Sequence, residues 1–121
     1  MAAGVGIDLI EIERVEAALA RRPRLAGRLF TDEELSDARE RRRPGRHLAA
    51  RFAAKEAAIK ALGTPVPPRE VEVRGGRDAA PTLRLHGRAA ALAEQRGMEL
   101  HVSLTHSREM AAAVVLALPG A

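Results

Sequence analysis

The sequence contains no cysteine, no tryptophan and no tyrosine, and it has only two phenylalanines among its 121 residues. Without cysteine the chain has no disulfide, no zinc site built on thiolates and no thiol nucleophile. Aromatic residues make up 2%, so the chain also lacks the side chains on which single-strand nucleic-acid readers usually stack bases. The core is therefore expected to consist of Ala, Leu, Val and Ile, together with Phe30 and Phe52.

Long apolar runs are absent as well. The most apolar segment, MAAAVVLAL at residues 110–118, is far shorter than the ~20 residues of a membrane-spanning helix. The N-terminal stretch MAAGVGIDLIEIER lacks the basic segment and long apolar run of a signal peptide. We therefore expect a soluble, cytoplasmic protein without a membrane partner.

The composition and length of the chain indicate a single globular domain with an excess of basic residues. Hydrophobic residues make up 46% and charged residues 30%, which is typical of a globular chain. The length suits one domain over residues 1–121 with a single core. Twenty Lys and Arg outnumber 16 Asp and Glu, and only Lys55 and Lys60 are lysines. This basic balance favours an anionic partner, such as a phosphorylated small molecule, an acidic protein or nucleic acid.

Hydrophobic periodicity predicts an α+β fold in which a mostly antiparallel sheet packs against helices. In the first strand Val5, Ile7 and Leu9 alternate with two glycines and Asp8. Thr31 and Glu34 form the sequence pattern of a helix capping box. Strands are expected at residues 3–10, 70–74, 82–86, 99–107 and 111–118, and helices at residues 11–22, 31–43, 46–62 and 87–97.

The helix containing RFAAKEAAIKAL carries charges beside its apolar stripe. Lys55 lies at the centre of this stripe, whose apolar members are Leu48, Phe52, Ile59 and Leu62. Arg51 flanks the stripe on one side, and Glu56 and Lys60 flank it on the other. One interpretation is an ordinary helical ion pair between Glu56 and Lys60, with Lys55 extending its charge to solvent. The other is a functional site, and the pattern alone names no partner for Lys55.

A functional site would need a second acid, and Asp8 is the candidate. Two carboxylates from different elements, with a lysine nearby, suit Mg²⁺ bound jointly with phosphate oxygens. Each residue also has a simpler interpretation. Asp8 suits a turn or a helix cap, Arg51 a solvated surface charge, and His106, in phase with the apolar positions of its strand, a hydrogen-bonded core histidine.

Three segments together resemble one family. GVGIDLIEIERV, RFAAKEAAIKALG and VSLTHS are similar in order and spacing to bacterial holo-[acyl-carrier-protein] synthases, the small 4'-phosphopantetheinyl transferases. The resemblance covers most of residues 4–63 and 100–116. It implies the 4'-phosphopantetheinyl transferase fold and transfer of the phosphopantetheine arm of coenzyme A to a serine of apo acyl carrier protein. The reaction would release 3',5'-ADP, require Mg²⁺ and serve fatty-acid or polyketide carriers.

The resemblance also assigns roles within the site. Asp8 and Glu56 match the metal ligands, Lys60 matches a lysine on the phosphates, and His106 matches a histidine at the coenzyme A pocket. Arg51 matches a basic residue that contacts coenzyme A. Glu56, Lys60 and His106 are the expected catalytic residues, with Glu56 accepting the serine proton.

The same resemblance implies roles for two clusters of arginines. An acidic carrier protein is expected to dock on Arg14, Arg21, Arg24 and Arg28, and Arg42 and Arg43 are expected to hold the nucleotide 3'-phosphate. The family implies a homotrimer with sites between subunits, and no nucleic-acid partner. Two alternatives stay open: a non-catalytic basic α+β module that binds nucleic acid, and a degenerate transferase fold that only binds its ligands.

Overall fold

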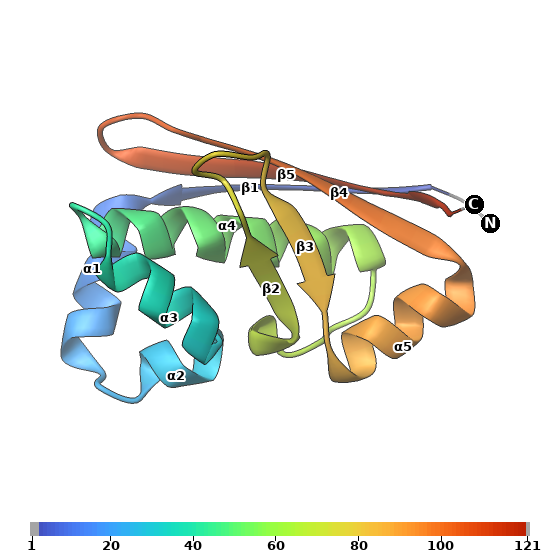
Figure 1. Cartoon of the computed structure of the whole chain (residues 1–121), viewed down its shortest axis with the longest axis horizontal. Coiled ribbons are helices and arrows are strands. Elements are labelled where there is room, and N and C mark those ends of the chain that lie inside the picture. Colours follow the sequence, from blue (N-terminus) through green and yellow to red (C-terminus); the bar gives the residue numbers. More distant parts are fainter. Residues whose placement is uncertain (1–2, 121) are drawn as a thin grey trace.

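A 19-residue helix, α4 (Pro44–Leu62), lies at the centre of the fold. In the computed structural model, which describes residues 3–120, α4 runs along one face of a three-stranded sheet (Figure 1). All seven of its alanines are buried, because neighbours pack on several sides of the helix. It begins two residues before the predicted Arg46, because Pro44 is compatible with the first helical turn.

The strands form two antiparallel sheets where the sequence suggested one. The larger sheet has the order β1–β5–β4, and the smaller sheet pairs β2 with β3. The register sets Asp8 opposite Ala113 and His106 opposite Ala111. The predicted α+β class is confirmed. The strands are β1 (Gly4–Glu11), β2 (Val71–Arg74), β3 (Thr82–Leu85), β4 (Met98–His106) and β5 (Met110–Pro119).

Strand β1 approaches α4 closely because two glycines face the helix. A β-carbon on Gly6 would overlap the carbonyl oxygen of Ala57, and one on Gly4 would overlap that of Ala61. The predicted alternation is confirmed, and the opposite face of β1 is exposed. The large apolar side chains exposed on this outer face of the sheet are Val5, Ile7, Leu9, Val114, Leu116 and Leu118.

Short helices occupy the two ends of the molecule. Helices α1 (Ile12–Arg21), α2 (Leu25–Leu29) and α3 (Asp32–Arg39) lie at one end and α5 (Gly87–Arg96) at the other (Figure 1). The predicted capping box at the start of α3 is present, whereas α2 and a 3₁₀ turn, η1 (Pro68–Glu70), were not predicted. Both are too short to show a period. Within the described residues, no helix is long and apolar enough to cross a membrane.

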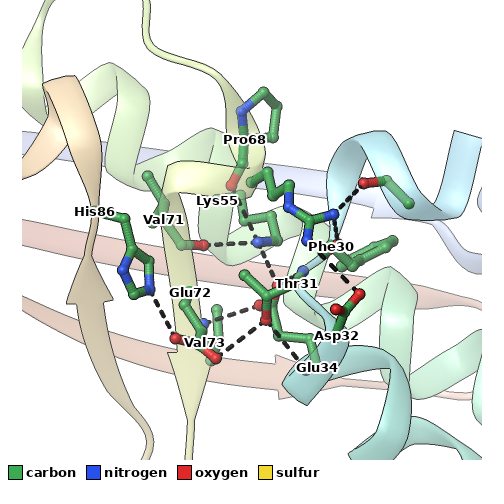
Figure 2. A network of polar contacts seen from close by, with 12 residues as sticks. Phe30, Thr31, Asp32, Glu34, Lys55, Pro68, Val71, Glu72, Val73 and His86 are labelled. Carbon is green, nitrogen blue, oxygen red and sulfur yellow. Dashed lines mark hydrogen bonds and ion pairs between the residues drawn. The ribbon is translucent and has the colours of Figure 1, made fainter.

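Lys55 is fully buried and satisfied, so the expectation that it reaches solvent is wrong. Its ammonium group donates to Glu34 Oε1 at 2.7 Å, Val71 O at 2.7 Å and Pro68 O at 3.0 Å (Figure 2). The second oxygen of Glu34 accepts from the backbone of Val73 at 2.9 Å. Lys55 therefore connects α4 to both α3 and the β2 segment through a paired, hydrogen-bonded charge.

Candidate active site

Strand β1 and helix α4 bring Asp8, Glu56 and Lys60 together. Lys60 Nζ lies 3.3 Å from Asp8 Oδ1 and donates to the carbonyl oxygen of Ile7 at 3.0 Å. Asp8 lies inside β1, which continues to Glu11, so its interpretation as a turn or cap residue is wrong. Lys60 forms its ion pair with Asp8 on another element, which makes the simple helical pair with Glu56 an incomplete description.

The charges of these residues favour the binding of a cation. Burial raises the pKa of Glu56, and the nearby Asp8 carboxylate raises it further, while Lys60 acts in the opposite direction. Asp8 Oδ2 is buried without a hydrogen-bond partner. Two neighbouring carboxylates, one with an unsatisfied oxygen, are hard ligands of the kind and number that Mg²⁺ takes when phosphate completes its coordination. The residues therefore fit the implied metal.

A second group of predicted residues lines a cationic cavity of about 440 Å³. Arg51 is only 4% exposed and donates to Gly75 O at 2.7 Å, so the expectation of a solvated surface charge is wrong. His106 is exposed at the end of β4, so the core-histidine interpretation is wrong too. The basic side chains of the wall are Arg41, Arg42, Arg43, Arg46, His47, Arg51 and His106.

The carboxylate pair and the cavity are separate groups within one chain. Asp8, Glu56 and Lys60 are not part of the cavity wall. Arg43, which is part of it, also donates twice to Glu16 of α1, at 2.9 and 3.3 Å. A small ligand within this cavity alone would therefore leave the carboxylates of the same chain uncontacted.

The arginines predicted for carrier docking surround two neighbouring hollows. Arg14 and Arg21 line a groove of about 580 Å³ whose floor is mostly apolar, and Arg21 also borders a second hollow with Arg24 and Arg28. The apolar residues of the groove include Val15, Leu19, Leu25, Leu29, Phe52 and Met110. The structure thus combines a basic rim with an apolar floor.

Sequence reasoning singled out Arg42 and Arg43 from the basic run at residues 39–46, but not Arg41, Arg46 or His47, which also line the cavity. Asp37 of α3, which touches Arg41 and His47, was missed as well. One signal was available, because His47 and Arg51 are four residues apart on α4 and must share a face. The position of α3 beside that face was not visible in the sequence.

Comparison with known proteins identifies the family. The sequence profile described as "4'-phosphopantetheinyl transferase superfamily" matches residues 4–115. The chain belongs to this superfamily. A holo-[acyl-carrier-protein] synthase of Streptomyces coelicolor is 50% identical over 94% of this chain and 95% of the relative. One from Moorella thermoacetica is 46% identical over 92% of this chain and 90% of the relative.

Solved structures of the superfamily share the fold. An ACPS–CoA complex from "Chronobacterium ammoniagenes" has a TM-score of 0.87 and 34% identity, with 100% of both chains covered. A holo-(acyl-carrier-protein) synthase from Bacillus anthracis in complex with CoA (3',5'-ADP) has a TM-score of 0.76 and 33% identity, with 94% of both chains covered. The chain is thus a phosphopantetheinyl transferase, an enzyme with the expected fold. This membership favours catalysis over the non-catalytic nucleic-acid module.

Proposed function

We propose that the chain transfers the 4'-phosphopantetheine group of coenzyme A to a serine of apo acyl carrier protein and releases 3',5'-ADP, in a Mg²⁺-dependent reaction. The observation that carries this proposal is the meeting of Asp8, Glu56 and Lys60 where β1 and α4 touch. The relatives' names supply the carrier protein and coenzyme A as substrates.

Asp8 and Glu56 are the proposed metal ligands, and the bound Mg²⁺ would neutralise charge on the pyrophosphate and its leaving phosphate. The unsatisfied Oδ2 of Asp8 supports this assignment. Lys60, more than half exposed beside Asp8, is available to bind a further phosphate oxygen. Placing positive charge around the reacting phosphorus is the main contribution a protein makes to phosphoryl transfer.

In the proposed reaction the serine oxygen attacks the β-phosphorus of coenzyme A. A new P–O bond to serine forms, the bond to the bridging pyrophosphate oxygen breaks, and 3',5'-ADP leaves with that oxygen. The serine proton passes to Glu56 as the proposed general base. Arg51 and His106 line the cavity proposed for the nucleotide part, together with Arg42 and Arg43.

We further propose a homotrimer in which each reaction site forms between subunits. Two features support it. The carboxylate pair does not share a cavity with the cationic residues of its own chain, so a neighbouring subunit could supply the missing half. The outer face of the sheet exposes six large apolar side chains, three of them about two-thirds exposed on β1, and such a patch is typical of an interface.

Carrier docking is proposed on the groove beside α1. Arg14 and Arg21 at its rim, with Arg24 and Arg28 nearby, complement an acidic protein surface. The apolar floor suits the apolar side of an amphipathic helix. We propose that the protein acts in the cytoplasm.

The decisive experiment incubates the protein with apo acyl carrier protein, coenzyme A and Mg²⁺ and measures the carrier mass. We expect the mass gain of one phosphopantetheine group and formation of 3',5'-ADP, both lost when Mg²⁺ is chelated. No gain with any of several fatty-acid and polyketide carriers would refute the proposed reaction and favour a fold that only binds its ligands.

The matched variants are Asp8→Asn and Glu56→Gln, which keep the side-chain shape and remove the charge. Both should lose turnover by several orders of magnitude while keeping the thermal unfolding midpoint close to that of the unaltered protein. Glu94→Gln, on the exposed outer side of α5, serves as the control and should retain full activity. Normal Mg²⁺-dependent turnover by Asp8→Asn would remove Asp8 from the metal site.

A further inference from the structure

One carboxylate contacts three basic side chains at the edge of the cavity. Asp37 Oδ2 lies 3.3 Å from His47 Nε2, 3.5 Å from Arg41 Nη2 and 3.7 Å from Arg51 Nη2. All three distances exceed the value of about 2.7–2.9 Å that is typical of strong charged hydrogen bonds. We name these four residues the Asp37 cluster. The single carboxylate of Asp37 holds the three basic side chains in place without satisfying all of their hydrogen-bonding capacity.

Two nitrogens of the Asp37 cluster form no hydrogen bond of good geometry, although one of them, His47 Nε2, lies 3.3 Å from Asp37 Oδ2. Within the described part of the chain, the buried side-chain atoms without one are Asp8 Oδ2, Arg41 Nε and His47 Nε2. The first belongs to the proposed metal site, and the other two belong to side chains of the cavity wall. Leaving a buried polar atom unpaired costs about 1–3 kcal/mol. Arg41 and His47 are therefore prepared for a hydrogen-bonding group that enters from the cavity.

The surroundings of His47 favour a negatively charged ligand. Burial lowers the pKa of His47 to about 4, the charges of Arg51 and Arg41 lower it further, and Asp37 acts in the opposite direction. The imidazole is thus neutral at pH 7. The charged and titratable side chains that face it are Asp37 from α3, Arg41, Arg42 and Arg43 before α4, Arg46 and Arg51 on α4, and His106 at the end of β4.

A phosphate in the cavity would change this balance. Its negative charge would offset the field of Arg41 and Arg51, which favours the protonated imidazole. A protonated His47 has two N–H donors. Nε2 could then donate to the phosphate while its charge is also stabilised by Asp37. Arg41 Nε, already a donor without a partner, could contact the same phosphate.

We propose that Arg41 and His47 together bind a phosphate group of the nucleotide, and that His47 takes up a proton from solvent when this phosphate enters. The inference rests on the proposed function, because it takes the cavity to hold the 3',5'-ADP part of coenzyme A. Asp37 is a positioning residue for this pair. The consequence is nucleotide binding that strengthens as the pH falls, by up to about tenfold per pH unit for one linked proton.

The test is calorimetric titration of 3',5'-ADP at pH 6.5 in two buffers of different ionisation enthalpy, which counts protons taken up on binding. His47→Gln should reduce the uptake by most of one proton and weaken binding about tenfold. Phosphate itself titrates near pH ~6, but this contribution is common to both proteins and disappears in their difference. Arg41→Lys, which keeps the charge and removes Nε–H, should weaken binding severalfold with proton uptake retained.

Controls use exposed residues outside the cavity. His101→Gln on β4 and Arg39→Lys on α3 should leave both affinity and proton uptake unchanged. Titration with 5'-AMP identifies the phosphate, because the uptake persists if the pair binds the 5'-phosphate and disappears if it binds the 3'-phosphate.

Equal proton uptake by the unaltered protein and His47→Gln would overturn the inference, as would absence of 3',5'-ADP binding. The carrier mass assay reports the proposed function separately. If the carrier gains mass while His47→Gln binds and takes up protons normally, the inference fails and the transferase assignment stands. If neither mass gain nor nucleotide binding occurs, both fail.

Discussion

Lys55 shows how a residue in the sequence motif can serve the fold. It lies beside Glu56 in the sequence, yet its ammonium group is not part of the candidate site. It contacts Glu34 and two carbonyl oxygens in the interior, at 2.7–3.0 Å. The ring of Phe30 lies 5.3 Å from the same nitrogen, within cation–π range. Every donor of the ammonium group has a partner, so the charge is retained in the interior. Lys55 thus fixes the helix on which Glu56 and Lys60 stand.

We expect Lys55→Met to destabilise the fold by about 3–5 kcal/mol, because it leaves the buried Glu34 carboxylate unpaired. Urea unfolding measures this loss. The double variant Lys55→Met/Glu34→Gln should lose less than the sum of the single variants, since the two groups depend on each other. Lys60→Met, with a side chain 56% exposed, should change the free energy of unfolding by less than about 1 kcal/mol. Strict additivity would contradict the coupling.

Glu72 predicts how stability responds to acid. Burial opposes its ionisation, but hydrogen bonds from His86, at 2.8 Å, and Thr31, at 3.0 Å, outweigh burial and lower the pKa of Glu72 (Figure 2). Its contribution is therefore complete above the unfolded-state pKa of about 4.3. It is lost as the pH falls through the lower folded-state value.

Glu72→Gln should lower the free energy of unfolding at pH 7 by about 1–3 kcal/mol. It should also make the decline in stability on acidification shallower. Urea unfolding at a series of pH values measures both effects, with the exposed Glu94→Gln as the control. Parallel pH profiles for Glu72→Gln and the unaltered protein would show that Glu72 carries no such linkage.

At the scale of elements, the contact between β1 and α4 sets the site geometry. Small residues on both sides, Gly4 and Gly6 against Ala57 and Ala61, let the two backbones approach more closely than side chains normally allow. Lys60 consequently reaches the backbone of Ile7 and the Asp8 carboxylate. The glycines therefore contribute to the site by setting the short distance between β1 and α4.

Gly6→Ala should destabilise the protein by about 1–3 kcal/mol or more, because the new methyl group meets helix backbone that has no room to yield. Turnover should fall with it, since Asp8 would move away from α4. Thermal unfolding and the carrier mass assay measure the two effects. Gly27→Ala in α2, where a β-carbon meets no atom within 4 Å, should be neutral or stabilising. Unchanged stability of Gly6→Ala would mean that β1 does not require this close approach.

At the scale of the whole molecule, the proposed subunit contact and the proposed carrier-docking groove lie on two neighbouring surfaces. The sheet shows an apolar outer face, while the region around α1 and α2 shows a groove with arginines at its rim. An apolar face suits a permanent subunit contact, and a charged rim suits a transient acidic partner. The two surfaces adjoin at Leu9, which is exposed on β1 and also lines the groove. Mutations at Ile7 and at Arg14, each of which belongs to one surface alone, separate the assembly prediction from the docking prediction.

Ile7→Lys should convert the proposed trimer to a monomer, because it places a charge in the centre of the apolar outer face, where Ile7 is 66% exposed in the single chain. Light scattering coupled to size-exclusion chromatography measures the mass. The control is Gln95→Lys, which adds the same charge on the exposed side of α5 and should not alter the assembly. A trimer that survives Ile7→Lys would place the subunit contact elsewhere.

Reversing the charge of Arg14 and Arg21 together should raise the KM for acyl carrier protein by at least about tenfold through lost charge complementarity. The affinity for 3',5'-ADP should not change, because neither residue lines the cationic cavity. Steady-state kinetics and calorimetry measure the two quantities. Arg84→Glu with Arg88→Glu, on β3 and α5, carries the same charge change away from the groove. A fall in nucleotide affinity with an unchanged KM would show that the docking surface is misplaced.

Much of this protein is already visible in its sequence. Alternation identified β1, the capping box located the start of α3, and Gly63 located the end of α4, where it adopts a positive φ of 71°. These features depend on neighbours in the chain, so local physics is sufficient to specify them. The motifs around Asp8, Glu56 and Lys60 also identified the family before any contact was known.

The tertiary structure decided which charges meet. Periodicity placed Lys55 on an apolar stripe without a partner, and only the packing of α3 and β2 against α4 brings Glu34 and the two carbonyl oxygens to it. The burial of Arg51 and the Asp37 cluster have the same origin. A contact across 21 residues, as between Glu34 and Lys55, leaves no periodic signal, because long-range pairing depends on how whole elements fill the space around one helix.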